Sequence, residues 1–266
     1  MPSSSRLCRR VPVRWPPVAR REAVENRGKG GNLRGKPGES GVIDVKNMTV
    51  FFLGYGARMI QDPAPQSLKF LAGHPDLGEF ARRAQLPALT PQPELLIAFG
   101  SSVIGQQLSG KAAASIEAKF CAAFGGSWPD ANTLQQTPLP SLRACGLSQA
   151  KAETLHRLAD ALTQTPISAQ EAQDLSDDEI TQRFTAIKGI GPWTVQMVLI
   201  FDLGRPDVWP VGDLAIRTGV ARLIGTSELP KPRVMETWAH EFLGHRSTLA
   251  RLIWHALDQK WLPPVG

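Results

Sequence analysis

The sequence has few cysteines and lacks any long apolar run. Its 266 residues are 42% hydrophobic, enough for a substantial core, but no run reaches the roughly 20 apolar residues of a membrane-spanning helix. We therefore expect a globular protein with no membrane partner. Cys8, Cys121 and Cys145 are too few and too scattered for a disulfide framework, which favours a reducing, intracellular compartment.

Metal-binding patterns are missing as well. The sequence contains no Cys-x-x-Cys pair, no His/Cys cluster and no His-Glu-x-x-His motif. Zinc and iron–sulfur sites need such spacings because their ligands must converge on one ion or cluster. We therefore expect no side-chain metal site and no redox cofactor.

The excess of positive over negative charge comes from the N-terminal part of the chain. The whole sequence has a net charge of +6 and a pI near 9.5. Residues 1–47 hold 11 Lys/Arg and 4 Asp/Glu, a net of +7, whereas the remaining residues hold 19 and 20, a net of −1. The basic pI therefore carries no information about what the folded part binds.

Residues 1–47 are rich in Arg, Pro and Gly and show neither helical nor strand periodicity. We expect a disordered basic extension over residues 1–60 and a folded domain over residues 61–266. The extension has two further interpretations, a nucleic-acid-binding arm or a misassigned start at Met48 or Met59. No apolar core follows the arginines, so a secretory signal is not predicted.

From about Pro65 onward, helical patterns alternate with short Gly/Pro/Ser breaks, which predicts an all-α fold. The stretches "PDANTLQQTP" and "RPDVWPVG" are predicted to be loops. The predicted helices span residues 66–72, 76–84, 93–105, 109–124, 139–144, 148–163, 169–174, 176–186, 192–203, 213–224, 231–243 and 246–260.

The stretch "AIKGIGPWTVQMVL" predicts a tight turn between two helices. Ser176 is a suitable N-cap for the first helix, and Gly189 can adopt the left-handed conformation that ends it. Gly191 would let another backbone approach closely, and Pro192 suits the first position of the second helix. The amides at that helix start can bind an anion such as a DNA phosphate, although a plain helical corner has the same pattern.

Four blocks in order resemble one family. The segment "IKGIGPWTVQMVLIFDLGRPDVWPVGDLAIRTGV" resembles the helix-hairpin-helix DNA glycosylases. The blocks "SSVIGQQLSGKAAASI", "CGLSQAKAETLHRLAD" and "FLGHRSTLARLIWHALD" are similar to the 3-methyladenine DNA glycosylase II (alkylbase DNA glycosidase) branch. Together they cover roughly residues 65–260. The resemblance implies two helical subdomains flanking a DNA-binding cleft with a helix-hairpin-helix motif.

The resemblance assigns catalysis to Asp213, which from the residues alone reads as a helix cap. In this family a carboxylate stabilises the sugar cation that forms as the N-glycosidic bond of a damaged base breaks, and it can orient or deprotonate the attacking water. Related bifunctional enzymes carry a Schiff-base lysine at the position of Trp193. The resemblance therefore implies a monofunctional hydrolase acting on alkylated purines such as 3-methyladenine and 7-methylguanine.

The family position of Trp193 also lines the pocket for the flipped base, where an aromatic face stacks on an electron-poor purine. Met197, one turn later, and His245 stand where relatives carry pocket aromatics. The alternative for Trp193 and Met197 is packing in the core, and the alternative for His245 is capping at the surface.

The resemblance also implies DNA contacts. It places Gln107 as the wedge that fills the gap left by the flipped base, with Gln106 beside it; hydrogen-bonding loop residues are the alternative. The expected backbone contacts are Ser109, Lys188, Gly189, Ile190 and Gly191. Lys151 is predicted to lie on a helix surface.

The family hairpin holds a cation, potassium or sodium, through main-chain carbonyls that correspond to Thr185, Ile187 and Gly189. No other cofactor is expected, and the expected partner is double-stranded DNA containing alkylated bases, bound by a monomer in the cytoplasm or nucleoid. Two alternatives remain, a non-catalytic DNA-binding module and a glycosylase for oxidised or mismatched bases.

Overall fold

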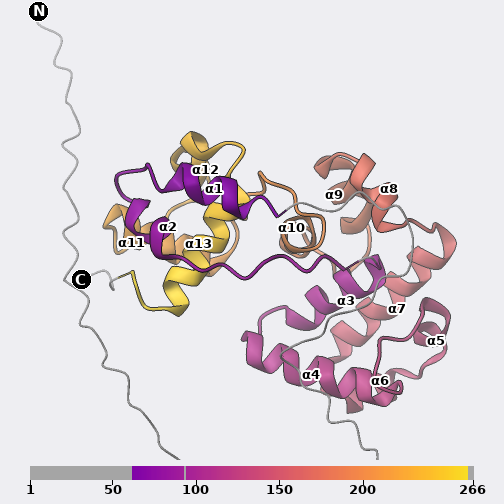
Figure 1. Ribbon diagram of the computed structural model, residues 1–266. Coiled ribbons are helices and arrows are strands. Elements are labelled where there is room, and N and C mark those ends of the chain that lie inside the picture. Colours follow the sequence, from indigo (N-terminus) through magenta and orange to yellow (C-terminus); the bar gives the residue numbers. More distant parts are fainter. Residues whose placement is uncertain (1–61, 93, 263–266) are drawn as a thin grey trace, which may run out of the picture. The chain divides into compact units, whose positions relative to one another are not determined.

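The computed structural model describes residues 62–92 and 94–262. Contacts divide the chain into two units, residues 1–56 and 57–266, and every described residue lies in the second. The predictions for the basic extension and the alternative start residues therefore lie outside the described residues. Every regular element among the described residues is helical (Figure 1), which confirms the all-α prediction.

The helices follow one another with short connections. In chain order they are α1 (Ala64–Leu71), α2 (Gly78–Arg83), α3 (Leu95–Gly105), α4 (Gly110–Ala123), α5 (Ala131–Gln136), α6 (Leu139–Ala144), α7 (Gln149–Gln164), α8 (Ala169–Asp174), α9 (Asp177–Thr185), α10 (Pro192–Phe201), α11 (Leu214–Ile224), α12 (Pro232–Ala239), the 3-10 helix η1 (His240–Phe242) and α13 (Arg246–Asp258).

Two predictions of secondary structure are corrected. The stretch predicted as the loop "PDANTLQQTP" contains α5, because the Asp130 carboxylate accepts a hydrogen bond from the Thr133 amide at 2.7 Å and Leu134 is fully buried. The predicted helix 231–243 is two elements, α12 and η1. The sequence contained the cap signal for α5, but the surrounding Pro, Asn and Gln favoured a loop.

Serine side chains begin several helices. The Ser168 hydroxyl accepts a hydrogen bond from the Glu171 amide, and the Glu171 carboxylate accepts one in return from the Ser168 amide. Ser176 and Glu179 form the same reciprocal pair at the start of α9. Such capping boxes satisfy amides that have no partner within the helix, so they fix where each helix begins.

Helices α3 to α9 form one group around a continuous core. In this group α3 packs against α4 and α7, and α7 also packs against α5 and α6. Phe99 of α3 and Phe184 of α9 stack with their ring centroids 3.8 Å apart, and both are fully buried. Helix α10 packs against α3 and α9, so the hairpin before it is attached to this core.

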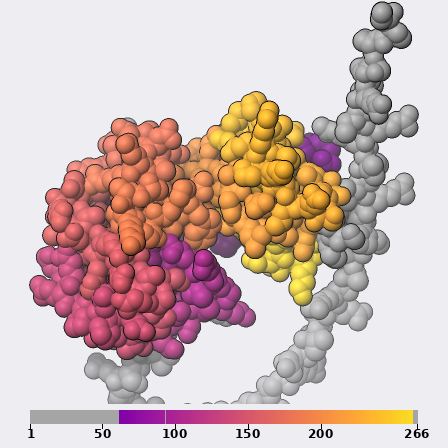
Figure 2. Space-filling model, turned by 180° about the vertical axis from the view of Figure 1, so that it is seen from behind, coloured from indigo at the N-terminus to yellow at the C-terminus, as the bar shows by residue number. Residues whose placement is uncertain are grey.

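The second group combines both ends of the described chain. Helices α1 and α11 pack against α13, and α2 contacts both α1 and α13. Gly219 of α11 is required here, because an added Cβ would collide with the Ile253 side chain of α13. The space-filling view shows the two groups as adjoining lobes (Figure 2). None of the described helices is long and apolar enough to cross a membrane.

Candidate active site

The hairpin between α9 and α10 depends on Gly189. Its φ is +102°, a region that favours glycine, and an added Cβ would overlap the Thr154 hydroxyl of α7. Gly191 is the N-cap of α10, and a Cβ there would meet no described atom within 4 Å. The expected close backbone approach to Gly191 is therefore wrong within the described chain, and its surface is open.

The other hairpin residues divide into exposed and buried. Lys188 is exposed, whereas Ile190 retains only 4% exposure and packs into the core of the first group. The Lys188 carbonyl accepts a hydrogen bond from Arg157 Nη1 of α7 at 3.3 Å. The Ile190 side chain is therefore a core residue, while the Lys188 side chain reaches solvent, and the expected DNA contacts of both stay predictions.

Gln106 joins the turn after α3 to the hairpin. Its side-chain nitrogen Nε2 donates to the Gly189 carbonyl at 3.1 Å and to Thr194 Oγ1 at 2.9 Å. Gln107 beside it is exposed and has a φ of 58°, an uncommon conformation for a residue other than glycine. Gln106 therefore holds the turn in place, and Gln107 projects from it.

Lys151 supports the same turn from α7. Its ammonium donates to the carbonyls of Ile104 and Gln106, both at 2.8 Å, and burial lowers the pKa of this lysine. The prediction that Lys151 decorates a helix surface is wrong, because its ammonium caps the C-terminal carbonyls of α3. Ser109 caps α4 through a hydrogen bond from the Ala112 amide at 3.4 Å.

Asp213 is the N-cap of α11, and its carboxylate is bound by two indoles in addition. Oδ1 accepts hydrogen bonds from the Ile216 amide at 2.8 Å and from Trp254 Nε1 at 3.3 Å. Oδ2 accepts one from Trp193 Nε1 at 2.7 Å. Asp213 is therefore both the helix cap and the candidate catalytic residue, and its carboxylate is oriented by donors from α10, α11 and α13.

The Asp213 carboxylate has few acceptor positions left for a further hydrogen bond. A carboxylate offers about four acceptor positions, and the three N–H donors around Asp213 occupy most of them. The remaining acceptor position is on Oδ2, the oxygen that has a single partner. One water molecule or one polarised group can therefore be held there.

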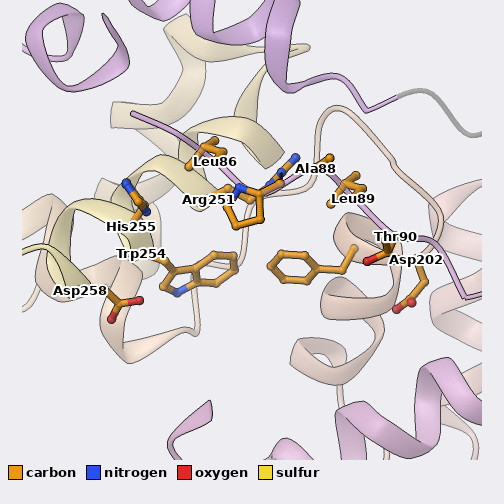
Figure 3. Close-up of a pocket in the computed structure, with 11 residues that line it drawn as sticks. Leu86, Ala88, Leu89, Thr90, Asp202, Arg251, Trp254, His255 and Asp258 are labelled. Atoms are coloured by element: carbon orange, nitrogen blue, oxygen red, sulfur yellow. Dashed lines mark hydrogen bonds between the residues drawn. The ribbon is translucent and has the colours of Figure 1, made fainter. Parts of the chain in front are cut away.

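A cavity of about 310 Å³ lies beside this site and shares the Trp254 side chain with it (Figure 3). The segment before α3 forms one wall and α10 and α13 form the others. Phe201 is 37% exposed, and its ring stacks with Trp254 at a centroid distance of 5.8 Å. The cavity is lined by Leu86, Pro87, Ala88, Leu89, Thr90, Phe201, Asp202, Arg251, Trp254, His255 and Asp258.

Phe201 continues one face of α10. Trp193, Met197 and Phe201 are spaced four residues apart and therefore lie along the same side of the helix. Met197 is buried in the core, and Trp193 is half-buried. The face thus leads from the Asp213 carboxylate to the cavity, and its spacing could have identified Phe201 from sequence.

Asp202 is a titratable group of the cavity with a shifted pKa. Burial raises its pKa to about 6, and a hydrogen bond from the Gln92 amide at 3.4 Å opposes this only weakly. The sequence alone does not identify Asp202 and Trp254 as site residues, because only the folded chain brings α13 to Asp213 and the loop at residues 86–90 to Asp202.

His245 lies elsewhere in the second group of helices. Its Nδ1 is 2.9 Å from the Ser67 hydroxyl, and its ring stacks on Phe70 of α1 at 4.2 Å. It does not line the cavity described above. The assignment of His245 to the base pocket stays a prediction.

The hairpin carbonyls expected to hold a cation are partly engaged. The Ile187 carbonyl accepts a hydrogen bond from the Ile190 amide at 3.0 Å, and the Gly189 carbonyl accepts one from Gln106. The cation at Thr185, Ile187 and Gly189 stays a prediction. Across residues 62–92 and 94–262, no group of three or more His, Cys, Asp or Glu side chains could hold a metal ion.

Comparison with known proteins identifies the family of the chain. Residues 101–244 match the model of the HhH-GPD superfamily of base excision DNA repair proteins. DNA-3-methyladenine glycosylase 1 of Schizosaccharomyces pombe is 36% identical over 156 residues, which cover 58% of this chain and 67% of that protein. The alkylbase DNA glycosidase-like protein mag2 of the same organism is 30% identical over 171 residues, 62% and 80% of the two chains.

A solved structure shows the same fold. The S. pombe 3-methyladenine DNA glycosylase Mag1 in complex with abasic DNA matches with a TM-score of 0.67 and 28% identity, covering 73% of this chain and 97% of that chain. The family model spans more than half of the sequence and includes the hairpin and Asp213. The chain therefore belongs to the HhH-GPD superfamily of base excision DNA repair proteins, in the branch of the DNA-3-methyladenine glycosylases.

Proposed function

We propose that this chain is a monofunctional DNA glycosylase that hydrolyses the N-glycosidic bond of alkylated purines, of the 3-methyladenine and 7-methylguanine type, in double-stranded DNA. The observation that carries the proposal is the Asp213 carboxylate, fixed by Trp193, Trp254 and the start of α11 beside a cavity with aromatic walls. Relatives that are enzymes support this function over the alternative of a non-catalytic DNA-binding module.

The proposed reaction breaks the bond between the sugar C1′ and the purine nitrogen. The bonding electrons leave with the base, so positive charge develops on the sugar, and the Asp213 carboxylate stabilises it. A water molecule held at the open position of Oδ2 then adds its oxygen to C1′ and releases a proton to the carboxylate or solvent. The carboxylate is already oriented before the substrate arrives, which avoids reorganisation during the reaction.

Two observations support hydrolysis without lyase chemistry. A β-lyase needs an amine that attacks C1′ to form a Schiff base. The side chain nearest the Asp213 carboxylate on α10 is the Trp193 indole, which donates to Oδ2 and is no nucleophile. The amine of Lys151 donates hydrogen bonds to the main-chain carbonyls of Ile104 and Gln106.

DNA binding is assigned to the hairpin and the neighbouring turn. The amides at the start of α10 lack partners within the helix and favour a phosphate, and Gly191 leaves the approach open. Gln107 projects from the turn that Gln106 fastens to the hairpin and is proposed to fill the gap left by the flipped base. The base itself is proposed to enter the cavity beside Trp254, where Phe201 stacks with Trp254 and extends the same aromatic wall.

The test is release of free base from duplex DNA containing 7-methylguanine or 3-methyladenine. Wild-type protein is expected to release the base, and Asp213→Asn is expected to lower the single-turnover rate by a factor on the order of 100 or more. Equal rates for the two proteins would remove Asp213 from the mechanism.

The monofunctional assignment has its own test. Borohydride reduction during turnover is expected to trap no covalent protein–DNA adduct, because no amine attacks the sugar. Efficient trapping would contradict this assignment and leave the glycosylase assignment intact. Preferential release of oxidised or mismatched bases over alkylated purines would favour that alternative substrate class.

A further inference from the structure

Asp202 occupies a position that is unfavourable for a carboxylate. It is the C-cap of α10, where the negative end of the helix dipole disfavours a carboxylate. Its carboxylate accepts a hydrogen bond from the Gln92 backbone amide at 3.4 Å, and within the described part of the chain it forms no ion pair. A half-buried carboxyl without a cationic partner, in a cavity, is a candidate for a functional role.

The other charged groups of the cavity do not neutralise Asp202. The Arg251 guanidinium pairs with Asp62 at 2.7 Å and donates to the Pro87 carbonyl at 2.6 Å, so its charge is already compensated. Asp258 lies toward the opposite end of the cavity from Asp202 (Figure 3). The lining therefore carries an excess of carboxylate, which suits a ligand with positive charge.

The walls of the cavity suit a flat ligand that carries a positive charge. Phe201 and Trp254 present aromatic rings, whose negative faces attract a cation. The apolar segment from Leu86 to Leu89 closes the cavity on another side, and low polarity strengthens an ionic contact. Aromatic rings and one carboxylate are a suitable environment for a cationic purine.

We propose that Asp202 is a specificity-determining residue that selects positively charged alkylpurines over neutral damaged bases. This inference rests on the proposed function. Alkylation at N3 or N7 gives the purine a positive charge, and its ring and amino N–H groups then donate charge-assisted hydrogen bonds to a carboxylate. Hypoxanthine is neutral and gains less from the same contact.

The contribution of Asp202 falls on substrate binding. As the glycosidic bond breaks, the base takes the bonding electrons and becomes neutral, while the positive charge moves to the sugar beside Asp213. The ionic contact with Asp202 is therefore strongest before bond cleavage and weakens toward the transition state. An interaction of this kind lowers KM and does not raise kcat.

The experiment compares wild type and Asp202→Asn on two duplexes that differ in the lesion, 7-methylguanine or hypoxanthine. We expect Asp202→Asn to raise KM for 7-methylguanine about tenfold, as for loss of a charged hydrogen bond, and kcat not to fall, because the contact weakens toward the transition state. KM for hypoxanthine is expected to change less than about twofold. Asp76→Asn, the same change at an exposed residue outside the cavity, is the matched control.

Each outcome has a distinct meaning. A selective rise in KM for the cationic lesion supports the inference. Equal losses on both lesions, or a fall in kcat with unchanged KM, would overturn it while leaving the glycosylase assignment in place. Release of neither base by the wild-type protein would overturn the proposed function, and the inference with it.

Discussion

Replacing Asp202 by asparagine is expected to stabilise the protein at neutral pH, even where it impairs recognition of cationic bases. Burial raises the pKa of Asp202 from 3.8 to about 6, so the folded state binds a proton more tightly than the unfolded chain. The folded protein therefore has its full stability below the unfolded pKa and loses part of it as the pH rises through the folded pKa. Asparagine keeps the shape and cannot ionise.

The magnitude follows from the pKa shift. A difference of about 2.2 pKa units corresponds to about 3 kcal/mol at pH values above both pKa values. At about pH 4.5 the same linkage gives about 1 kcal/mol, so the gain from Asp202→Asn is expected to grow by about 2 kcal/mol between about pH 4.5 and pH 7.5. Taking this difference removes the pH-independent cost of inserting the amide.

Urea unfolding of both proteins at the two pH values measures this quantity, provided that the slope with denaturant is unchanged. The exposed Asp76→Asn variant is the control, with little expected change in the difference. If wild type and Asp202→Asn lose or gain stability in parallel between the two pH values, the carboxyl does not titrate as a buried, unpaired group. Asp202 would then not destabilise the fold at neutral pH, and its ionisation would give no reason to assign it a function.

Two further predictions concern the frame around the site. Gly189→Ala is expected to cost about 2 kcal/mol or more of unfolding free energy, because its φ is positive and the methyl group would overlap Thr154; Gly191→Ala, which meets open space, should change the thermal midpoint little. Asp62→Ala should cost about 3 kcal/mol because it leaves the buried Arg251 charge unpaired. The Arg251 hydrogen bond holds the pKa of Asp62 below its ordinary value, so this stabilisation is present above about pH 4 and is lost as the pH falls. Similar acid sensitivity of wild type and Asp62→Ala in chemical unfolding would contradict the second prediction.

The residues identified from sequence are those that local motifs place. The hairpin glycine and the cap at Asp213 lie within short stretches whose spacing determines their conformation, so both could be predicted. Trp193 was predicted from the family resemblance to line the base pocket, and that role stays a prediction. Its indole N–H bonds the carboxylate, an edge contact that the expectation of a stacking surface did not include.

The remaining part of the site depends on contacts between distant segments. Trp254 is 41 residues from Asp213, and Gln92 is 110 residues from Asp202. No local periodicity encodes such pairs, since helix packing alone brings them together. Lys151 is a similar case, because an unremarkable lysine in an amphipathic helix finds the end of α3 only in the folded chain.

The link that Gln106 makes between the turn and the hairpin has a consequence for affinity. A loop that is mobile before binding must lose conformational freedom when DNA arrives, and that loss subtracts from the binding free energy. Here the Gln106 amide and the Lys151 ammonium have already fixed the turn during folding. For the turn proposed to enter the duplex, the entropy of ordering is therefore lost once, when the chain folds, and is not lost again at each DNA site that the protein samples.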